Sequence, residues 1–460
     1  MRDQTKKSWA VLCALFLLAL LFFSIPIEHK YDKLFRLYSH TLLPDGLTLP
    51  RPLFDRKIFF YASDLMILAL FGWMCIKRCS LLRGTFFLIG FLLCGLLSIV
   101  CSPLSHYPVV YLHFLQFLTP VLLFVFLVNG PIRKELLFKY LSRALIATSC
   151  LQSIFACAQY VLQHPLGLRL FSEQPFQAAI AVPGGHRFLF DQLMHRVAPS
   201  EIVYRAAGTL SHPNLLGGLL LIGLMLTTYF LWQFPKRRKI LISIYLLQFL
   251  GLAVTYSRAA LFAYLLASGI WFFWMWRSSI SSSLRTPILT ALSSILLVTI
   301  LLHEQYVCRG GVFNYPPSVA QSDQERLLYQ EVAMQMVTAS PMTGVGFGQF
   351  SLQAPSFLPQ GVAHLLANVH NIYLLIAAEL GMAALLFFLG WIFSIFWSFF
   401  RSTSSPESKV LFSIFVGFLF IGFCDFYPIA CQQGRLCFFG IAGLLTRFSQ
   451  DLSRESLLRY

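Results

Sequence analysis

Long apolar runs separated by short polar turns repeat along nearly the whole chain. The runs lie at 8–27, 58–76, 84–102, 107–128, 141–162, 214–234, 240–257, 259–276, 287–303, 371–399, 410–425 and 436–446. A helix needs about 20 apolar residues to cross a hydrocarbon layer roughly 30 Å thick. The pattern therefore predicts an all-α polytopic membrane protein with about 12 transmembrane helices. We expect residues 1–460 to form a single integral membrane domain.

The composition supports this interpretation and excludes a soluble globular enzyme. Of the 460 residues, 57% are hydrophobic and only 12% are charged, whereas soluble domains have about 25% charged residues. The formal charge of +16 would suggest nucleic acid on a soluble protein. On so apolar a chain it indicates basic residues kept at the cytoplasmic ends of helices, or an anionic substrate at the membrane surface. We expect a lipid bilayer as partner and no nucleic acid.

The basic residues gather in alternate polar turns and so predict an orientation. With a cytoplasmic N-terminus, the inner segments are 77–83, 129–140, 235–239, 277–286, 400–409 and 447–460, and both termini are cytoplasmic. The outer side then receives 28–57 and the two long loops 163–212 and 303–370. The 28–57 segment is itself basic and departs from the rule. No metal-ligand spacing occurs, so we expect neither a metal ion nor a cofactor.

The long 303–370 loop carries its own helical pattern. Between 324 and 337, apolar residues recur at helical spacing, which predicts an amphipathic helix on the outer membrane surface, through Leu327, Leu328, Val332 and Met336. Arg326 falls in its first turn. The glycines at 344, 346 and 348 are interpreted as a tight turn, since a dinucleotide fingerprint needs strand, turn and helix in order.

His370 is the candidate general base. It lies at the first turn of the next long helix, beside Asn371. A helix N-terminus and nearby guanidinium groups favour the neutral imidazole, the form that accepts a proton. The alternative is that the pair only caps the helix or contacts lipid headgroups.

Three arginines near the outer ends of apolar runs are candidates for an anion site. Arg205 precedes a span, Arg258 lies between two spans, and Arg326 is in the outer loop. Each alone is explained by snorkelling to headgroups. Together they suggest a diphosphate, because the planar guanidinium fork binds phosphate oxygens.

Acidic and amide side chains within the spans have several interpretations. Asp64, Glu379 and Asp425 could orient an arginine, relay a proton or tie helices together, and the last is favoured for Asp64. His212 is interpreted as part of a helix start. Gln152 and Gln159, which share a helix face, are assigned to helix packing.

Five segments, in this order, resemble the O-antigen ligase and polymerase superfamily of bacterial inner-membrane glycosyltransferases. They are RAAGTLSHPNLLGGLL, TYSRAALFAYLL, SPMTGVGFGQF, HNIYLLIAAELG and DFYPIACQQGR. The resemblance covers roughly 200–445 and implies a GT-C-like fold with short amphipathic helices in the large periplasmic loop. One departure is Met382 to Ala384 after E-L-G, where the family often has a second glycine; this concerns packing.

The resemblance implies transfer of a glycan from undecaprenyl diphosphate to an acceptor hydroxyl at the periplasmic face of the inner membrane, without a metal. The acceptor would be lipid A-core, another glycan or a similar hydroxyl. Carried over by motif, His370 is the catalytic residue, and Arg258, Arg326 and Arg205 bind the diphosphate. Asn371, Glu379 and Asp425 are possible supporting residues.

Two other functions remain open at this point. A polysaccharide polymerase of the same superfamily would share these motifs, although the long loop directly before His-Asn favours a ligase. A transporter of lipid-linked sugar would also need many helices and a basic outer site. Transporters often contain repeats with paired broken helices, and the two halves of this sequence show no obvious repeat.

Overall fold

A computed structural model gives the fold for most of the chain. It describes residues 11–21, 62–77, 84–168, 173, 179–186, 200–277, 285–310, 317–358, 368–402 and 405–449. The basic 28–57 segment, and with it the exception to the predicted orientation, lies outside these residues.

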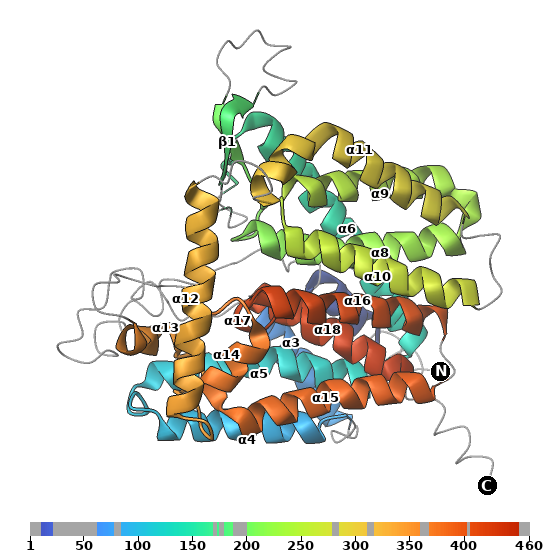
Figure 1. The fold of residues 1–460 in the computed structure, drawn as a ribbon. Helices are drawn as coiled ribbons and strands as arrows, with labels where there is room; N and C mark the ends of the chain where they lie inside the picture. The colour runs from blue at the N-terminus through green and yellow to red at the C-terminus, as the bar shows by residue number, and fades with distance from the viewer. Residues whose placement is uncertain are drawn as a thin grey trace, which may run out of the picture.

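The described chain forms a helical bundle whose long helices run roughly side by side (Figure 1). In the first half the helices are α3 (Ala62–Ile76), α4 (Phe86–Cys101), α5 (Pro108–Asn129), α6 (Lys134–Leu162), α8 (Pro213–Gln233) and α9 (Arg238–Val254). In the second half they are α10 (Arg258–Arg277), α11 (Arg285–Gly310), α12 (Pro317–Ala339), α13 (Phe350–Gln353), α14 (Ile372–Leu380), α15 (Met382–Arg401), α16 (Pro406–Cys424), α17 (Tyr427–Ala430) and α18 (Gln432–Ser449).

The prediction of a multi-pass membrane protein is confirmed. Among the described residues, six helices are long and apolar enough to span a membrane: α5 from Val110, α6, α8, α10, α15 and α16. The apolar helices Val11–Leu21, α3 and α4 are shorter. Helices also occupy the other predicted runs, but the number of twelve crossings stays a prediction.

The apolar run 371–399 is not the single continuous helix that the sequence predicts, because the helix is broken at Gly381. This residue has φ +86°, which separates α14 from α15. A Cβ there would lie 2.2 Å from the carbonyl oxygen of Met342. The Met382 N–H donates to the Pro341 carbonyl at 2.8 Å. The break thus lets the outer loop pack directly into the gap between the two helices.

A small β-ribbon lies within the 163–212 loop of this otherwise helical protein. Strand β1 (Ala179–His186) pairs antiparallel with β2 (Ser200–Tyr204), with Ala179 opposite Tyr204 and an irregular register after Ala181. The ribbon ends immediately before Arg205. The loop that follows the ribbon carries Arg205 and leads to the start of α8.

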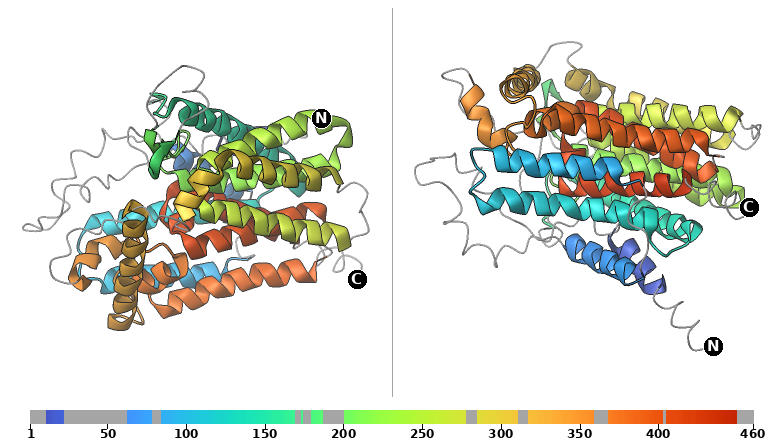
Figure 2. Two further views of the ribbon diagram at one scale, coloured as in Figure 1. Left: turned by 45° about the horizontal axis from the view of Figure 1, so that its top comes forward. Right: turned by 90° about the horizontal axis from the view of Figure 1, so that it is seen from below.

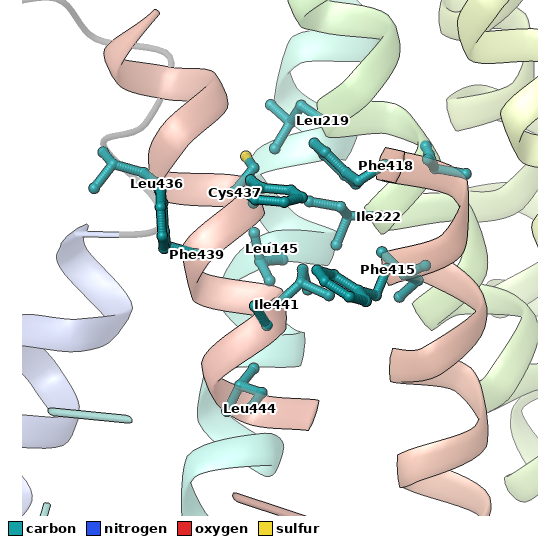
Figure 3. Packing of buried hydrophobic residues seen from close by; sticks show 14 of the residues in the cluster. Leu145, Leu219, Ile222, Phe415, Phe418, Leu436, Cys437, Phe439, Ile441 and Leu444 are labelled. Atoms are coloured by element: carbon teal, nitrogen blue, oxygen red, sulfur yellow. The ribbon is translucent and has the colours of Figure 1, made fainter. Parts of the chain in front are cut away.

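The core is dominated by large aromatic and aliphatic side chains. Trp271 and Trp391 are completely buried, and α18 packs between neighbouring helices (Figure 3). The contacting side chains include Leu145 of α6, Leu219 and Ile222 of α8, Phe415 and Phe418 of α16, and Cys437 and Ile441 of α18. Asp64 ties helices together as expected: it accepts hydrogen bonds from Thr119 at 2.7 Å and Gln432 at 2.8 Å.

Helix α12 crosses one end of the bundle almost at right angles to the other helices (Figure 1) and is seen close to end-on in the second view of Figure 2. If the bundle axis follows the membrane normal, α12 lies along one membrane surface; that this is the outer surface stays a prediction. Of the predicted apolar face, Val332 and Met336 are buried and Leu327 is 61% exposed. Val332 and Met336 form the buried face together with Tyr329 and Ala333, and this face packs with Val369, Leu375 and Ala378.

Basic residues gather at the opposite end of the bundle. The α8–α9 turn, which carries Lys236 and Arg237, and the C-terminal residue of α15, Arg401, lie at the end away from α12 (Figure 1). This separation agrees with the predicted positive-inside arrangement. The orientation itself stays a prediction.

Candidate functional site

The three arginines named from separate parts of the sequence line one cavity near the α12 end of the bundle. Arg205, Arg258 and Arg326 surround a space of about 270 Å³, together with Asn214 and Asp425. Arg205 comes from the loop after β2, Arg258 begins α10, and Arg326 lies on α12. Tertiary folding thus brings together residues that are up to 121 positions apart (326 − 205).

Arg205 is held rigidly at the cavity wall. Its side chain is only 3% exposed. The Nε donates to the Thr255 carbonyl at 2.9 Å, and Nη2 donates to Oδ1 of Asn214 at 2.9 Å. A guanidinium fixed in this way needs no reorganisation when it meets an anion.

Arg326 reaches the same cavity with a hydrogen-bond donor still available. Its Nε is buried and has no hydrogen-bond partner among the described residues. Burying an unpaired donor costs free energy, about 1–3 kcal/mol and more for charged groups. Helices α8 and α10 also begin at this cavity, at Pro213 and Arg258, and helix N-termini favour anions. The cavity is therefore suited to an anionic ligand.

Asp425 connects the cavity to His370. Its Oδ2 accepts a hydrogen bond from Asn214 Nδ2 at 2.7 Å, and Oδ1 lies 3.2 Å from Nδ1 of His370. Oδ1 also accepts from the Phe426 N–H at 2.8 Å. A polar chain therefore runs from Arg205 through Asn214 and Asp425 to His370.

Asp425 also sets the protonation pattern of the histidine ring. Burial raises the pKa of this carboxyl, but the hydrogen bond with His370, with contributions from the neighbouring His212 and Asn214, lowers it below its ordinary value. An ionised carboxylate only accepts hydrogen bonds, so the proton belongs on Nδ1 of His370. This arrangement leaves Nε2 as the nitrogen that can accept a proton.

The surroundings of His370 hold the ring while leaving part of it open. Its centroid lies 5.0 Å from the ring of Phe426 and 6.4 Å from that of Tyr329. The side chain remains 22% exposed. Tyr329 follows Arg326 on α12, so the same helix borders both groups. His370 is thus positioned beside the arginine cavity and is accessible to a second substrate.

Asn371 and Glu379 have structural contacts rather than positions in the cavity lining. Asn371 caps α14, since its side chain accepts from the N–H groups of Tyr373 at 2.9 Å and Leu374 at 3.0 Å. The Glu379 carboxylate accepts from the N–H groups of Gly348 and Phe350, each at 2.9 Å. It therefore holds the glycine-rich turn, which is a packed loop at the break in the helix.

His212 caps α8, as the sequence suggested. Its Nδ1 accepts a hydrogen bond from the Asn214 N–H at 3.1 Å. The cap fixes the first turn of α8, and with it the side chain of Asn214 between Arg205 and Asp425.

Two glutamines assigned to helix packing instead hold the loop that carries Arg205. Gln159 accepts from the N–H groups of Ala207 at 3.1 Å and Gly208 at 2.8 Å and donates to the Gly208 carbonyl at 2.7 Å. Gln152 accepts from the Thr209 N–H at 2.9 Å. Two amides seven residues apart in an apolar helix were the only sequence signal for this role.

Replacing Gln159 by leucine is expected to destabilise this loop. The change leaves two buried backbone N–H groups without their acceptor, at about 1–3 kcal/mol each. We expect a lower unfolding temperature for the purified protein in detergent, whereas Gln330→Leu on the exposed face of α12 should leave it unchanged. Unchanged unfolding of Gln159→Leu would show that the loop is held by other contacts.

Comparison with known proteins finds one family that matches part of the chain. No curated protein matches the chain. The O-antigen ligase family model matches residues 243–389, a region that contains Arg258, Arg326 and His370. The matched region runs from α9 into α15, and over it the chain is similar to the O-antigen ligase family.

Proposed function

We propose that the protein transfers a glycan from undecaprenyl diphosphate to an acceptor hydroxyl on lipid A-core or a similar glycan. The reaction would occur at the periplasmic face of the inner membrane, invert the configuration of the sugar carbon and need no metal ion. The observation that carries the proposal is the cavity lined by Arg205, Arg258 and Arg326, with the His370–Asp425 pair at its edge.

The charge of the cavity fits a diphosphate leaving group. Three guanidinium groups face one carboxylate, which gives a formal charge of +2 (3 − 1) in the lining. The N-termini of α8 and α10 add partial positive charge. As the bond from the sugar carbon to the phosphate oxygen breaks, negative charge grows on that oxygen. Preorganised donors stabilise this charge in the transition state.

His370 supplies the base for the acceptor. The acceptor oxygen attacks the sugar carbon on the face opposite the diphosphate, and its proton passes to Nε2 of His370. The imidazolium that forms lies next to the Asp425 carboxylate, 3.2 Å from Nδ1. Asp425 would therefore both orient the ring and stabilise its charged form.

A defined reaction in proteoliposomes tests the function. Lipid-linked donor and lipid A-core acceptor are placed on one leaflet with the purified protein. Appearance of glycan on lipid A-core is the expected result. Lengthening of the donor-linked glycan without an added acceptor would identify a polymerase. Movement of donor between leaflets without any transfer would identify a transporter and overturn the proposal.

The phenotype of a deletion strain gives an independent check. A ligase predicts that glycan-capped lipopolysaccharide disappears while polymer accumulates on the lipid carrier. A polymerase predicts that single glycan units remain attached to lipid A-core. Resolving the extracted lipopolysaccharide by chain length separates the two.

A further inference from the structure

A second, larger cavity lies toward the opposite end of the bundle. Its volume is about 1150 Å³, and it is bordered by α6, α8 and α9, with the first residues of α16 at one side. Pockets for small ligands usually measure about 300–1,000 Å³. This cavity is therefore large enough for a molecule bigger than an ordinary metabolite.

The two cavities are well separated. Asn214 of α8 borders the arginine cavity, and Tyr229 of the same helix borders the larger one. Fifteen residues of α-helix span about 22 Å. The larger cavity is therefore not part of the proposed diphosphate site.

The walls of the larger cavity are mainly apolar. They are formed by Ile146 and Ala147 of α6, Phe230 of α8, and Leu241, Ile244 and Leu247 of α9. These residues belong to helices that pack against one another along their length. The walls offer a place for a hydrocarbon chain that would otherwise lie in the bilayer.

The entrance to this cavity is basic. Lys139 and Arg143 on α6 and Arg237 in the α8–α9 turn border it, and all three are exposed. The two acidic residues of the lining have other contacts: Glu135 lies 3.7 Å from Arg133, and Glu407 accepts from the Tyr229 hydroxyl at 2.6 Å. The entrance thus presents positive charge beside an apolar space.

We propose that this cavity binds an anionic phospholipid, with an acyl chain along the apolar walls and the phosphate at Lys139, Arg143 and Arg237. The cavity lies at the basic end of the bundle, which the positive-inside rule assigns to the cytoplasmic leaflet. Basic pockets between membrane helices on that side are suited to anionic headgroups. A neutral phospholipid would fit the apolar walls but would bring no net negative charge to the basic entrance. The proposal therefore predicts that the cavity binds anionic phospholipids more tightly than neutral ones.

Lipid titration with the purified protein tests the proposal. Delipidated protein in detergent is titrated with dioleoylphosphatidylglycerol or dioleoylphosphatidylcholine, and bound lipid is counted by native mass spectrometry. We expect one tightly held phosphatidylglycerol. The triple variant Lys139→Gln, Arg143→Gln, Arg237→Gln should bind it about 100-fold more weakly, since each surface cation contributes about fivefold.

A matched triple variant separates a site from general attraction. Lys236→Gln, Arg238→Gln, Lys239→Gln removes the same amount of charge from the residues on either side of Arg237, none of which lines the cavity. It should retain tight binding. Equal weakening in both triple variants, or equal binding of the two lipids by the wild-type protein, would overturn the proposal.

Filling the cavity provides a test that does not depend on charge. Ala147→Trp places a large side chain in the cavity, whereas Ile154→Trp adds the same side chain at an exposed position farther along α6. We expect loss of the bound phosphatidylglycerol only in the first variant. Retention of the lipid by Ala147→Trp would show that it binds elsewhere.

Discussion

His370→Ala is expected to lower the rate of glycan transfer by about 10²–10⁴-fold, the range that general-base assistance contributes. The variant should still insert and fold, because the helix cap of α14 is made by Asn371 rather than by His370. The measurement is the initial rate of transfer in proteoliposomes at saturating donor and acceptor. Rates are normalised to the amount of folded protein.

A second histidine and the partner carboxylate complete this test. His106→Ala, at an exposed histidine outside the arginine cavity, should transfer at the wild-type rate. Asp425→Asn should be impaired less severely than His370→Ala, since the ring remains but loses its charged partner at 3.2 Å. If His370→Ala transfers glycan at an unchanged rate, His370 is not the base.

Arg326→Lys is the second change with a large expected effect. Removing one preorganised donor from a developing negative charge typically costs about 10²–10³-fold in kcat. Lysine keeps the positive charge but loses the planar fork. It also loses the buried Nε–H that has no partner among the described residues. We therefore expect a large fall in kcat for Arg326→Lys and a larger fall for Arg326→Ala.

The kinetic pattern distinguishes this role from simple contact with lipid headgroups. An interaction made mainly in the transition state lowers kcat, while uniform binding of the donor raises KM alone. Arg285→Lys, at an exposed residue that begins α11 and lies outside the cavity lining, is the matched control. Wild-type kinetics for Arg326→Lys would indicate that Arg326 only snorkels. Arg258→Lys should behave like Arg326→Lys, since Arg258 lines the same cavity.

Most residues of the candidate site could be identified from the sequence. The free-energy cost of placing a charged side chain beside a hydrophobic span depends only on the local sequence. Arginine beside a hydrophobic span is expensive unless it has a function or reaches the headgroups, so Arg205, Arg258 and Arg326 stood out one by one. Asp425 stood out for the same reason. The sequence could not assign Asp425 its partner, because His370 is 55 residues away and the two meet only when α14 packs against α16.

Other assignments failed because they depend on long-range backbone contacts. The sequence predicts Gln159 as a packing residue, yet its side chain accepts from the N–H groups of Ala207 and Gly208, 48 and 49 residues away. The apolar run at 371–399 predicts one helix, yet Gly381 breaks it where the outer loop approaches. Apolar periodicity contains no information about such contacts.

By itself, the sequence predicted repeated apolar helices of membrane-spanning length and, in part of the chain, a similarity to the O-antigen ligases. The reason is that the transfer of apolar residues into lipid and the retention of basic residues at one side depend on composition and order alone. Only the tertiary structure decided which polar groups meet. Three arginines from different segments share one cavity, and His370 pairs with Asp425, because helix packing and backbone hydrogen bonds set their positions in space.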